Sequence, residues 1–424
     1  MGISFRVYSE GSLEGQDRMW PLDFIPRLIR KSEWLQVEKG LKQRVKALNM
    51  FIEDCYNKQQ FLNESDIDKS LVLDSPAFKT YCIGMKLKHS AWSHICGSDL
   101  IKAHDGKFYV LEDNLRVPSG VCYMLENRMI MKRVFPELFY QYGVTPIDAY
   151  PTKLYETLAS VKNSRSKNPE IVLLTPGIFN SAYHEHSFLA QQMGIDLVEG
   201  RDLIVDKDGF VYKKTIEGLI KIDVIYRRVD DDYLDPEQGN NNSAIGVKGL
   251  IKAWQEKKVA IVNSPGCGIA DDKAIYSFVP KMIRFYLNEE PIIKNIKTFI
   301  LTNKEQREHV FNNFKEMVIK PVAESGGYGI VIGKNCTRQE KESTIRKVMN
   351  NPRNFVAQPL ISLSTAPTYS GENIAPRHLD LRPFILTGEN QYVTVGGLTR
   401  VALKEGSTVV NSSQGGGSKD TWIV

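Results

Sequence analysis

The chain has 424 residues, and its 55 Lys and Arg residues exceed its 50 Asp and Glu residues by only five. So small an excess over this length argues against a nucleic-acid-binding protein, and no apolar run is long enough to cross a membrane. We expect two or three domains and a cytoplasmic location, because the N-terminus lacks the basic start and apolar core of a signal peptide. The six scattered cysteines contain no C-x-x-C pair, which favours reduced thiols over disulfides or a zinc site.

The first segment, residues 1–150, mixes helix and strand. Apolar residues recur at helical spacing from Leu35 to Phe51 and predict a helix packed on one face. A hairpin at 99–114 and a helix at 123–134 follow.

The middle segment, residues 151–255, shows the pattern of a parallel sheet. A buried strand at 171–175, a helix ending near 194 and a strand at 196–200 are typical of a parallel α/β unit. A further strand is predicted at 224–227, and the polar stretch 235–243 reads as a loop.

The last segment, residues 256–424, alternates short strands with helices. It ends in three strand-like pieces, at 380–386, 392–395 and 407–411. This pattern indicates a nucleotide-binding α/β module.

A glycine-rich loop in the last segment is a candidate phosphate site. A predicted strand ends at Lys320 and is followed by Ser325, Gly326, Gly327, Tyr328 and Gly329. Glycines there let backbone N–H groups approach phosphate oxygens. The loop is not a Walker A motif, because no G-K-[ST] follows and a strand comes next. Taken alone, it fits an ordinary glycine-rich hairpin better.

The hairpin at 99–114 is a candidate metal site. Counting outward from a two-residue Asp105-Gly106 turn sets Asp99 opposite Glu112. Asn114 lies on the same face as Glu112. Facing carboxylates repel each other, and a cluster of carboxylate and carboxamide oxygens suits Mg²⁺. The alternative is three solvated side chains on an exposed hairpin.

Charged residues near these features could act on an anionic substrate. Arg116, Ser119 and Gly120 follow the hairpin and add a cation, a hydroxyl and a flexible glycine. Lys273 follows two aspartates at a predicted helix start, where a solvated surface lysine is the simpler interpretation.

Two arginines near the C-terminus are candidate phosphate ligands. Arg382 shares a strand face with Asp380, and Arg400 lies on a later strand. Guanidinium groups suit phosphoryl or carboxylate oxygens. The alternative is a structural pair between Asp380 and Arg382.

Two other charged stretches are less convincing as sites. His184 and His186 lack the i, i+4 spacing of a helical zinc pair, so we expect them on a helix surface or between domains. The run 230–232 of three aspartates is interpreted as a solvated turn.

Together these stretches resemble the circularly permuted (type 2) ATP-grasp proteins related to glutathionylspermidine synthase. The resemblance covers nearly the whole chain and is most specific at 110–120, 271–273, 320–329 and 411–420. The metal motif precedes the phosphate lysines, as a permuted chain would show. The resemblance implies an α/β fold with α+β lobes and a Rossmann-like pre-ATP-grasp domain around 171–200.

The resemblance also implies roles for single residues. Asp99, Glu112 and Asn114 would bind Mg²⁺; Lys273, Lys320 and the loop Ser325 to Gly329 would contact ATP phosphates; Gln358 and Leu360 would hold adenine; Arg382 and Arg400 would stabilise the transferring phosphoryl group; Arg116, Ser119 and Gly120 would hold the acceptor substrate.

The implied reaction is ATP-dependent carboxylate–amine or carboxylate–thiol ligation through an acyl phosphate. Its substrates would be a small amino-acid-like or peptide-like carboxylate and an amine acceptor. A phosphotransferase, or a nucleotide-binding scaffold that needs a partner, are the alternatives. The family pattern leads us to expect a longer N-terminal segment, and the amidase domain of glutathionylspermidine synthase has no counterpart here. The substrates' identity and the oligomeric state are not predicted.

Overall fold

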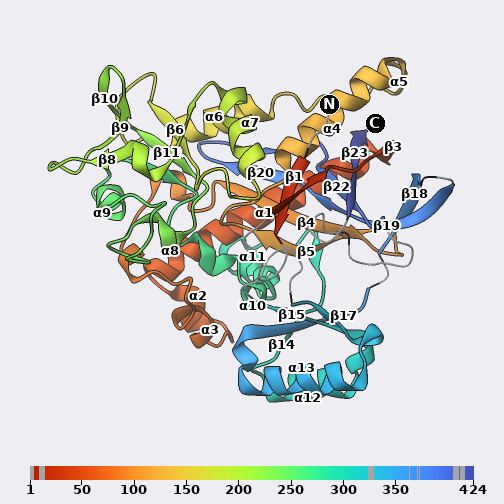
Figure 1. The fold of residues 1–424 in the computed structure, drawn as a ribbon. Helices are drawn as coiled ribbons and strands as arrows, with labels where there is room; N and C mark the ends of the chain where they lie inside the picture. Colours follow the sequence, from red (N-terminus) through yellow and green to blue (C-terminus); the bar gives the residue numbers. More distant parts are fainter. Residues whose placement is uncertain are drawn as a thin grey trace.

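The computed structural model describes residues 4–8, 15–322, 329–361, 363–369, 371, 373–403, 410 and 416–424. These residues form a mixed α/β fold built on several sheets (Figure 1). Among the helices of the described residues, none combines the length and apolar character needed to span a bilayer.

The central sheet combines strands from the front and the back of the chain. Its main path runs in the order β13 (Lys294–Asn295), β5 (Phe108–Asn114), β4 (Ile95–Lys102), β19 (Ile374–Arg382), β22 (Leu398–Val401), β23 (Gly417–Ile423) and β3 (Leu22–Ile29). Three further strands extend it, β20 (Phe384–Thr387) and β21 (Gln391–Val393) beside β4, and β18 (Thr365–Tyr369) beside β19.

Strands from opposite ends of the chain are neighbours in this sheet. β23 pairs with β3 in parallel, and Figure 1 shows the two ends of the drawn chain on the same side of the molecule. The β4–β5 hairpin from the front of the chain lies next to β19 from its back. The large sheet therefore unites two segments that are separated in sequence.

Two layers of helices cover the central sheet. The predicted helix at Leu35–Phe51 lies within α1 (Lys31–Tyr56), whose apolar face packs in a core with Leu100 and Ile385. The other face of the sheet packs against α4 (Val121–Val134) and α6 (Tyr150–Ser160) through Phe384. Helices cover both faces, so apolar residues occur on either side of the strands.

A second sheet is parallel throughout. Its order is β12 (Ala260–Val262), β11 (Val224–Arg227), β6 (Ile171–Leu174) and β7 (Asp196–Val198), with α7 (Tyr183–Met193) between β6 and β7 in the chain. The predicted parallel α/β unit is confirmed at the level of strand pairing.

A third sheet is antiparallel and carries Lys320, the lysine predicted to bind phosphate. Its order is β14 (Phe299–Ile300), β17 (Phe355–Pro359), β15 (Met317–Pro321) and β16 (Val331–Ile332). The helices α12 (Lys304–Asn312) and α13 (Arg338–Asn350) cover one face of it (Figure 1).

Smaller elements complete the described fold. They are the sheet of β8 (Leu203–Val205), β9 (Val211–Thr215) and β10 (Gly218–Lys221), the hairpin of β1 (Ser4–Tyr8) and β2 (Gly15–Met19), and the helices α2 (Gln60–Glu64), α3 (Ser70–Leu73), α5 (Pro136–Tyr142), α8 (Asp231–Leu234), α9 (Leu250–Gln255), α10 (Lys273–Tyr276) and α11 (Val279–Leu287).

Two of the three predicted C-terminal strand pieces match observed strands in part. Pro383 divides the predicted strand 380–386 into β19 and β20, because proline has no N–H to continue a ladder. The piece at 392–395 overlaps β21, while 407–411 lies almost wholly outside the described residues. All six cysteines are free, as expected, and five of them are buried.

A buried ion pair holds α1 to the central sheet. The Arg44 guanidinium donates through Nε to both Asp113 carboxylate oxygens, at 2.9 and 2.8 Å, and through Nη1 to Asn295 Oδ1 at 2.6 Å. Ser98 Oγ also donates to Asp113, at 2.8 Å. Both side chains of the pair are 1% exposed. Helix and strands are thus joined by charges that have no access to water.

We predict that removing one partner of this pair strongly destabilises the fold. Asp113→Ala leaves a buried, uncompensated guanidinium, which costs about 3–5 kcal/mol. The matched control is Asp148→Ala, which breaks a pair with Lys132 whose side chains are 64% and 43% exposed and costs about 0–1 kcal/mol. The urea midpoint of the first cooperative unfolding transition measures both. Equal midpoints for the two variants would contradict the prediction.

Candidate functional site

The predicted metal ligands lie together on β4 and β5. The register sets Asp99 opposite Glu112 and Gly97 opposite Asn114, as predicted for the carboxylate pair. Asn114 donates its side-chain N–H to the Gly97 carbonyl at 3.1 Å. The hairpin therefore presents two carboxylates and a carboxamide close to one another.

The register arises differently from the prediction. The turn is one residue wider than expected, because Ala103 pairs with Lys107. This turn alone would set Asp99 opposite Leu111. A β-bulge then shifts the strands by one residue, so that Glu112 faces Asp99 instead. Bulges of this kind commonly re-aim side chains next to active sites.

Two arginines from neighbouring strands bind Asp99. Arg382 on β19 donates to both carboxylate oxygens, at 2.5 and 2.8 Å, and Arg400 on β22 donates to one of them at 2.6 Å. Asp99 is 2% exposed. Burial alone would raise the pKa of Asp99, but the two guanidinium groups outweigh it and hold the pKa below its usual range.

The predicted alternative, a structural ion pair between Asp380 and Arg382, is wrong. Asp380 forms its ion pair with Arg400, across the β19–β22 pairing, rather than with Arg382. Burial raises the pKa of the Asp380 carboxyl, against the lowering effect of Arg400. Arg382 is left with Asp99 and lies 3.9 Å from Glu112, so its guanidinium connects the two predicted metal ligands.

Two lysines also lie near these carboxylates. Lys273 begins α10 after the helix cap Asp272, as predicted, and its amine lies 3.8 Å from Glu112. Lys320 on β15 is 8% exposed. Burial and the nearby Lys273 lower the pKa of Lys320, whereas Glu112 and Asp99 raise it. Four cations thus face Asp99, Glu112 and Asp380, a balance that favours an added anion.

The sheet face that carries Lys320 also carries Gln358, which is predicted to bind adenine. Lys320 pairs with Val356 and Val318 pairs with Gln358, so Lys320 and Gln358 lie on one face. This face is opposite the one that α12 and α13 cover. Gln358 is buried and donates to Thr298 Oγ1 at 3.0 Å, and the Leu360 N–H donates to the Glu316 carbonyl at 2.7 Å.

The predicted phosphate loop is described only at its end. Ser325, Gly326, Gly327 and Tyr328 lie outside the described residues. Gly329 has φ of 69° and lies so close to Pro321 that a Cβ would approach it to 2.8 Å. Both features require glycine at this position.

The hairpin's donor set fits a hard cation. A carboxylate has about four lone-pair positions, and Asp99 uses three in the hydrogen bonds from Arg382 and Arg400. Within the described part of the chain, Glu112 has only the longer contacts, at 3.8 Å to Lys273 and 3.9 Å to Arg382. Among the residues that the structure describes, no group of three or more His, Cys, Asp or Glu is arranged so that it could hold a metal ion by itself. Few protein oxygens, completed by water and phosphate, are typical of Mg²⁺.

The loop after the hairpin is held at both ends. At its start, Arg116 donates to Asp271 at 2.9 Å and to Asp230 at 3.0 Å. The Asp271 carboxylate is the main cause that raises the pKa of Arg116. Further along, Arg382 donates to the Ser119 carbonyl at 3.2 Å, so the loop reaches the arginines bound to Asp99.

Two residues without any local sequence signal for a site, Arg228 and Glu185, hold the other end. Arg228 donates to Ser119 Oγ at 2.5 Å, and Glu185 accepts from the Gly120 N–H at 2.6 Å. The two also pair with each other at 3.1 Å, with side chains at most 2% exposed. A Cβ on Gly120 would approach Leu398 to 2.9 Å. Ser119 and Gly120 therefore join the site to the parallel sheet.

Two sequence interpretations need correction. The expected position is wrong for His186, which is buried 2.9 Å from Thr175 Oγ1, whereas His184 has the expected position, with a side chain 40% exposed on α7 and in contact with Glu126 of α4. The run 230–232 is not a solvated turn, because Asp231 is buried and lies 2.7 Å from the Arg227 guanidinium. The partners, Thr175 for His186 and Arg227 for Asp231, lie outside the short sequence motifs on which the predictions were based.

Comparison with known proteins identifies relatives over the full length of the chain. An uncharacterized protein of Synechocystis is 49% identical over 425 residues, which cover 100% of this chain and 88% of that protein. An uncharacterized protein of Mycobacterium tuberculosis is 47% identical over 424 residues, covering 100% of this chain and 76% of that protein.

A Frankia casuarinae relative has a functional name. The protein "Putative glutamate--cysteine ligase 2-2" is 38% identical over 425 residues, covering 100% of this chain and 48% of that protein. This chain thus spans about half the length of the Frankia protein, and the printed name describes that whole protein.

A family model and a solved structure agree on the fold. The solved apo form of a glutathione synthetase-like effector from Globodera pallida superposes with a TM-score of 0.60 at 12% identity, covering 96% of this chain and 91% of that one. A likeness at this identity shows the fold alone. The family model described as circularly permuted ATP-grasp type 2 matches residues 26–402. The chain belongs to the circularly permuted ATP-grasp type 2 family.

Proposed function

We propose that the protein is a Mg-ATP-dependent ligase that joins a carboxylate to an amine or a thiol through an acyl phosphate. The observation that carries the proposal is the convergence of Asp99, Glu112, Lys273, Lys320 and Arg382 from separate segments. Family membership supports an ATP-dependent reaction. The printed name of the Frankia relative is compatible with ligation of amino acids.

In this proposal the nucleotide lies against the β15–β17 face. Lys320 and Lys273 bind phosphate oxygens, Ser325 to Gly329 close over them, and Gln358 and Leu360 hold the adenine. Glu112, Asn114 and Asp99 would hold Mg²⁺, which neutralises phosphate charge when bound. Lys320 is well suited to this role, because burial has already removed its water and a phosphate would restore favourable contacts.

The chemistry would need positioning rather than covalent catalysis. A substrate carboxylate oxygen attacks the γ-phosphorus of ATP, and ADP leaves. The amine or thiol then attacks the acyl carbon, loses its proton, and inorganic phosphate leaves. Arg382, next to both Asp99 and Glu112, would offset charge on the transferring group, and Arg400 would fix Asp99 and Arg382 in place.

The loop Arg116, Ser119 and Gly120 would hold the acceptor substrate. The hydrogen bond from Arg382 to the Ser119 carbonyl supports this proposal. We further propose a small amino-acid-like or peptide-like substrate, no nucleic-acid partner, and a cytoplasmic location. The segments 1–150, 151–255 and 256–424 serve as front part, Rossmann-like pre-ATP-grasp domain and nucleotide lobes, with β12 of the last segment added to the parallel sheet.

An acyl phosphate can be trapped chemically. We predict that the purified protein, incubated with Mg-ATP, hydroxylamine and a panel of amino acids and dipeptides, forms a hydroxamate with one carboxylate of the panel. The measurement is the coloured ferric complex together with phosphate release. A phosphorylated product that is stable to hydroxylamine would instead show a phosphotransferase. If neither phosphate release nor a phosphorylated product is detected, the result would favour a scaffold.

Lys320 and Arg382 should affect different steps. Lys320→Met should weaken Mg-ATP binding about tenfold to a hundredfold, because a desolvated charged hydrogen bond is lost. Arg382→Lys should lower kcat about a hundredfold or more with a smaller change in nucleotide affinity, because lysine cannot reproduce the bidentate geometry. Lys347→Met, on the exposed side of α13, is the control. Equal effects of all three variants on affinity and kcat would contradict these roles.

A further inference from the structure

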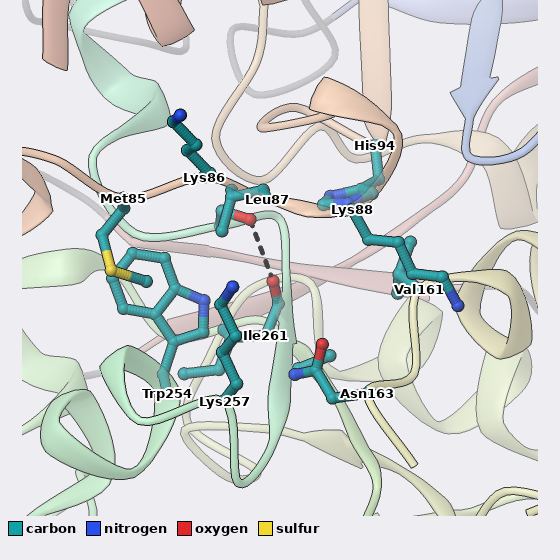
Figure 2. A pocket seen from close by; sticks show the side chains of 12 residues that line it. Met85, Lys86, Leu87, Lys88, His94, Val161, Asn163, Trp254, Lys257 and Ile261 are labelled. Atoms are coloured by element: carbon teal, nitrogen blue, oxygen red, sulfur yellow. Dashed lines mark hydrogen bonds between the residues drawn. The ribbon is translucent and has the colours of Figure 1, made fainter. Parts of the chain in front are cut away.

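A hollow of about 270 Å³ lies between the parallel sheet and the segment that leads into β4 (Figure 2). Lys86, Lys88 and Lys257 line it, and their amines point apart in Figure 2. Lys88 already donates to the Lys162 carbonyl at 3.1 Å. These lysines therefore do not share one ligand position. The buried contacts of the short helix α10, by contrast, meet at the candidate site.

Helix α10 connects the two sheets that carry the candidate site. Its first residue, Lys273, lies 3.8 Å from Glu112 of β5 in the central sheet. Its second residue, Ala274, lies in one buried cluster with Val356, the strand partner of Lys320 in the third sheet. Figure 1 shows α10 between these two sheets. The contacts that hold α10 therefore also set the spacing between the predicted metal ligands and the predicted phosphate lysines.

The last residue of α10, Tyr276, is buried against β5 and is 3% exposed. Its hydroxyl donates to the Val110 carbonyl at 2.5 Å and accepts from the Ile296 N–H at 2.9 Å. Burial raises the pKa of Tyr276, so the phenol keeps its proton and can donate. The Ile296 N–H also lies 3.1 Å from the Val110 carbonyl. This carbonyl is thus held by two donors from outside the β4–β5 pair.

The Val110 carbonyl lies at the entrance to the β-bulge that aims Glu112. Val110 pairs with Leu100 and Glu112 pairs with Asp99, so Leu111 is the extra residue of the bulge. The peptide bond from Val110 to Leu111 is planar, and the direction of the Val110 carbonyl therefore sets the course of the chain into the bulge. A donor that fixes this carbonyl helps to decide on which face of β5 the Glu112 side chain emerges.

Two residues outside α10 hold Tyr276 in turn. The Arg44 guanidinium lies over the Tyr276 ring, with its Cζ atom 5.2 Å from the ring centroid, which is within the range of a cation–π contact. Asn295 donates to the main-chain carbonyl of Tyr276 at 2.8 Å and accepts from Arg44 Nη1 at 2.6 Å. The ring and the main chain of Tyr276 are therefore both fixed.

We propose that Tyr276 is a positioning residue of the Mg-ATP site, a role that rests on the proposed ligase function. Its hydroxyl keeps the bulge in the form that turns Glu112 toward Asp99, and its helix holds Lys273 beside Glu112. Tyr276 acts through Glu112 and not by contacting the nucleotide. Loss of the hydroxyl should therefore affect the Mg²⁺-dependent part of nucleotide binding more than the part that the lysines supply.

Isothermal titration of the full chain with ATP, with and without Mg²⁺, tests this role. Tyr276→Phe keeps the buried ring and removes the hydroxyl. It should lower the ratio of the ATP affinities with and without Mg²⁺ about tenfold, because one buried hydrogen bond no longer holds the bulge. The matched control is Tyr286→Phe, which removes a hydroxyl that donates to Asp54 at 2.8 Å. This bond joins α11 to α1, which carry none of the proposed ligands, so the ratio should not change.

Hydrogen–deuterium exchange of the same proteins separates this role from a general loss of stability. In Tyr276→Phe, peptides from β4 and β5 should exchange faster, while peptides from β6 and β11 should exchange as in the wild type. The proposal is overturned if Tyr276→Phe keeps the Mg²⁺ dependence, if its affinity falls equally with and without Mg²⁺, if Tyr286→Phe has the same effect, or if exchange in β4 and β5 is unchanged. If the wild type binds no Mg-ATP, the proposed ligase function fails, while the exchange measurement still decides whether Tyr276 fixes the hairpin.

Discussion

The carboxylate of Asp99 joins three strands of the central sheet at the point where the front and back of the chain meet. It lies on β4 and binds Arg382 on β19 and Arg400 on β22. Burying one carboxylate is costly unless it is paired and hydrogen-bonded. Here the charges alternate along a network in which Arg382 pairs with Asp99, Asp99 pairs with Arg400, and Arg400 pairs with a second carboxylate, that of Asp380. The arrangement fixes Arg382, whose contact with Glu112 makes it the part of the network nearest the proposed phosphates.

The same arginine extends the network to the parallel sheet. Arg382 donates to the carbonyl of Ser119, whose hydroxyl accepts from Arg228, which in turn pairs with Glu185. The loop from Arg116 to Gly120 is therefore held between the charges of the proposed phosphoryl site and the buried ion pair of Arg228 and Glu185. This contact chain gives a physical reason for the loop to keep one geometry beside Arg382, as ordered transfer between two substrates requires.

The sequence predicts local features well and long-range charge partners poorly. Turn chemistry predicts that Asp99 faces Glu112, and the structure has this pair. It arises because a turn one residue wider than predicted shifts the strand register by one residue, and a β-bulge shifts it back. The C-terminal strand β23 was missed because Lys419 and Asp420 look exposed in sequence. Both are buried, since Lys419 pairs with Asp23 and Asp420 with Arg128, hundreds of residues away along the chain. Nothing local marks Glu185 and Arg228 either, for the same reason.

The central claim is that the front hairpin holds the metal for phosphates bound by the third sheet. Isothermal titration of ATP, with and without Mg²⁺, tests it most directly when the wild type is compared with Glu112→Ala. The account predicts one Mg-ATP site in the wild type, with affinity that depends on Mg²⁺, and loss of most of that dependence in Glu112→Ala. Absence of Mg-ATP binding in the wild type, or an unchanged response to Mg²⁺ in the variant, would contradict it.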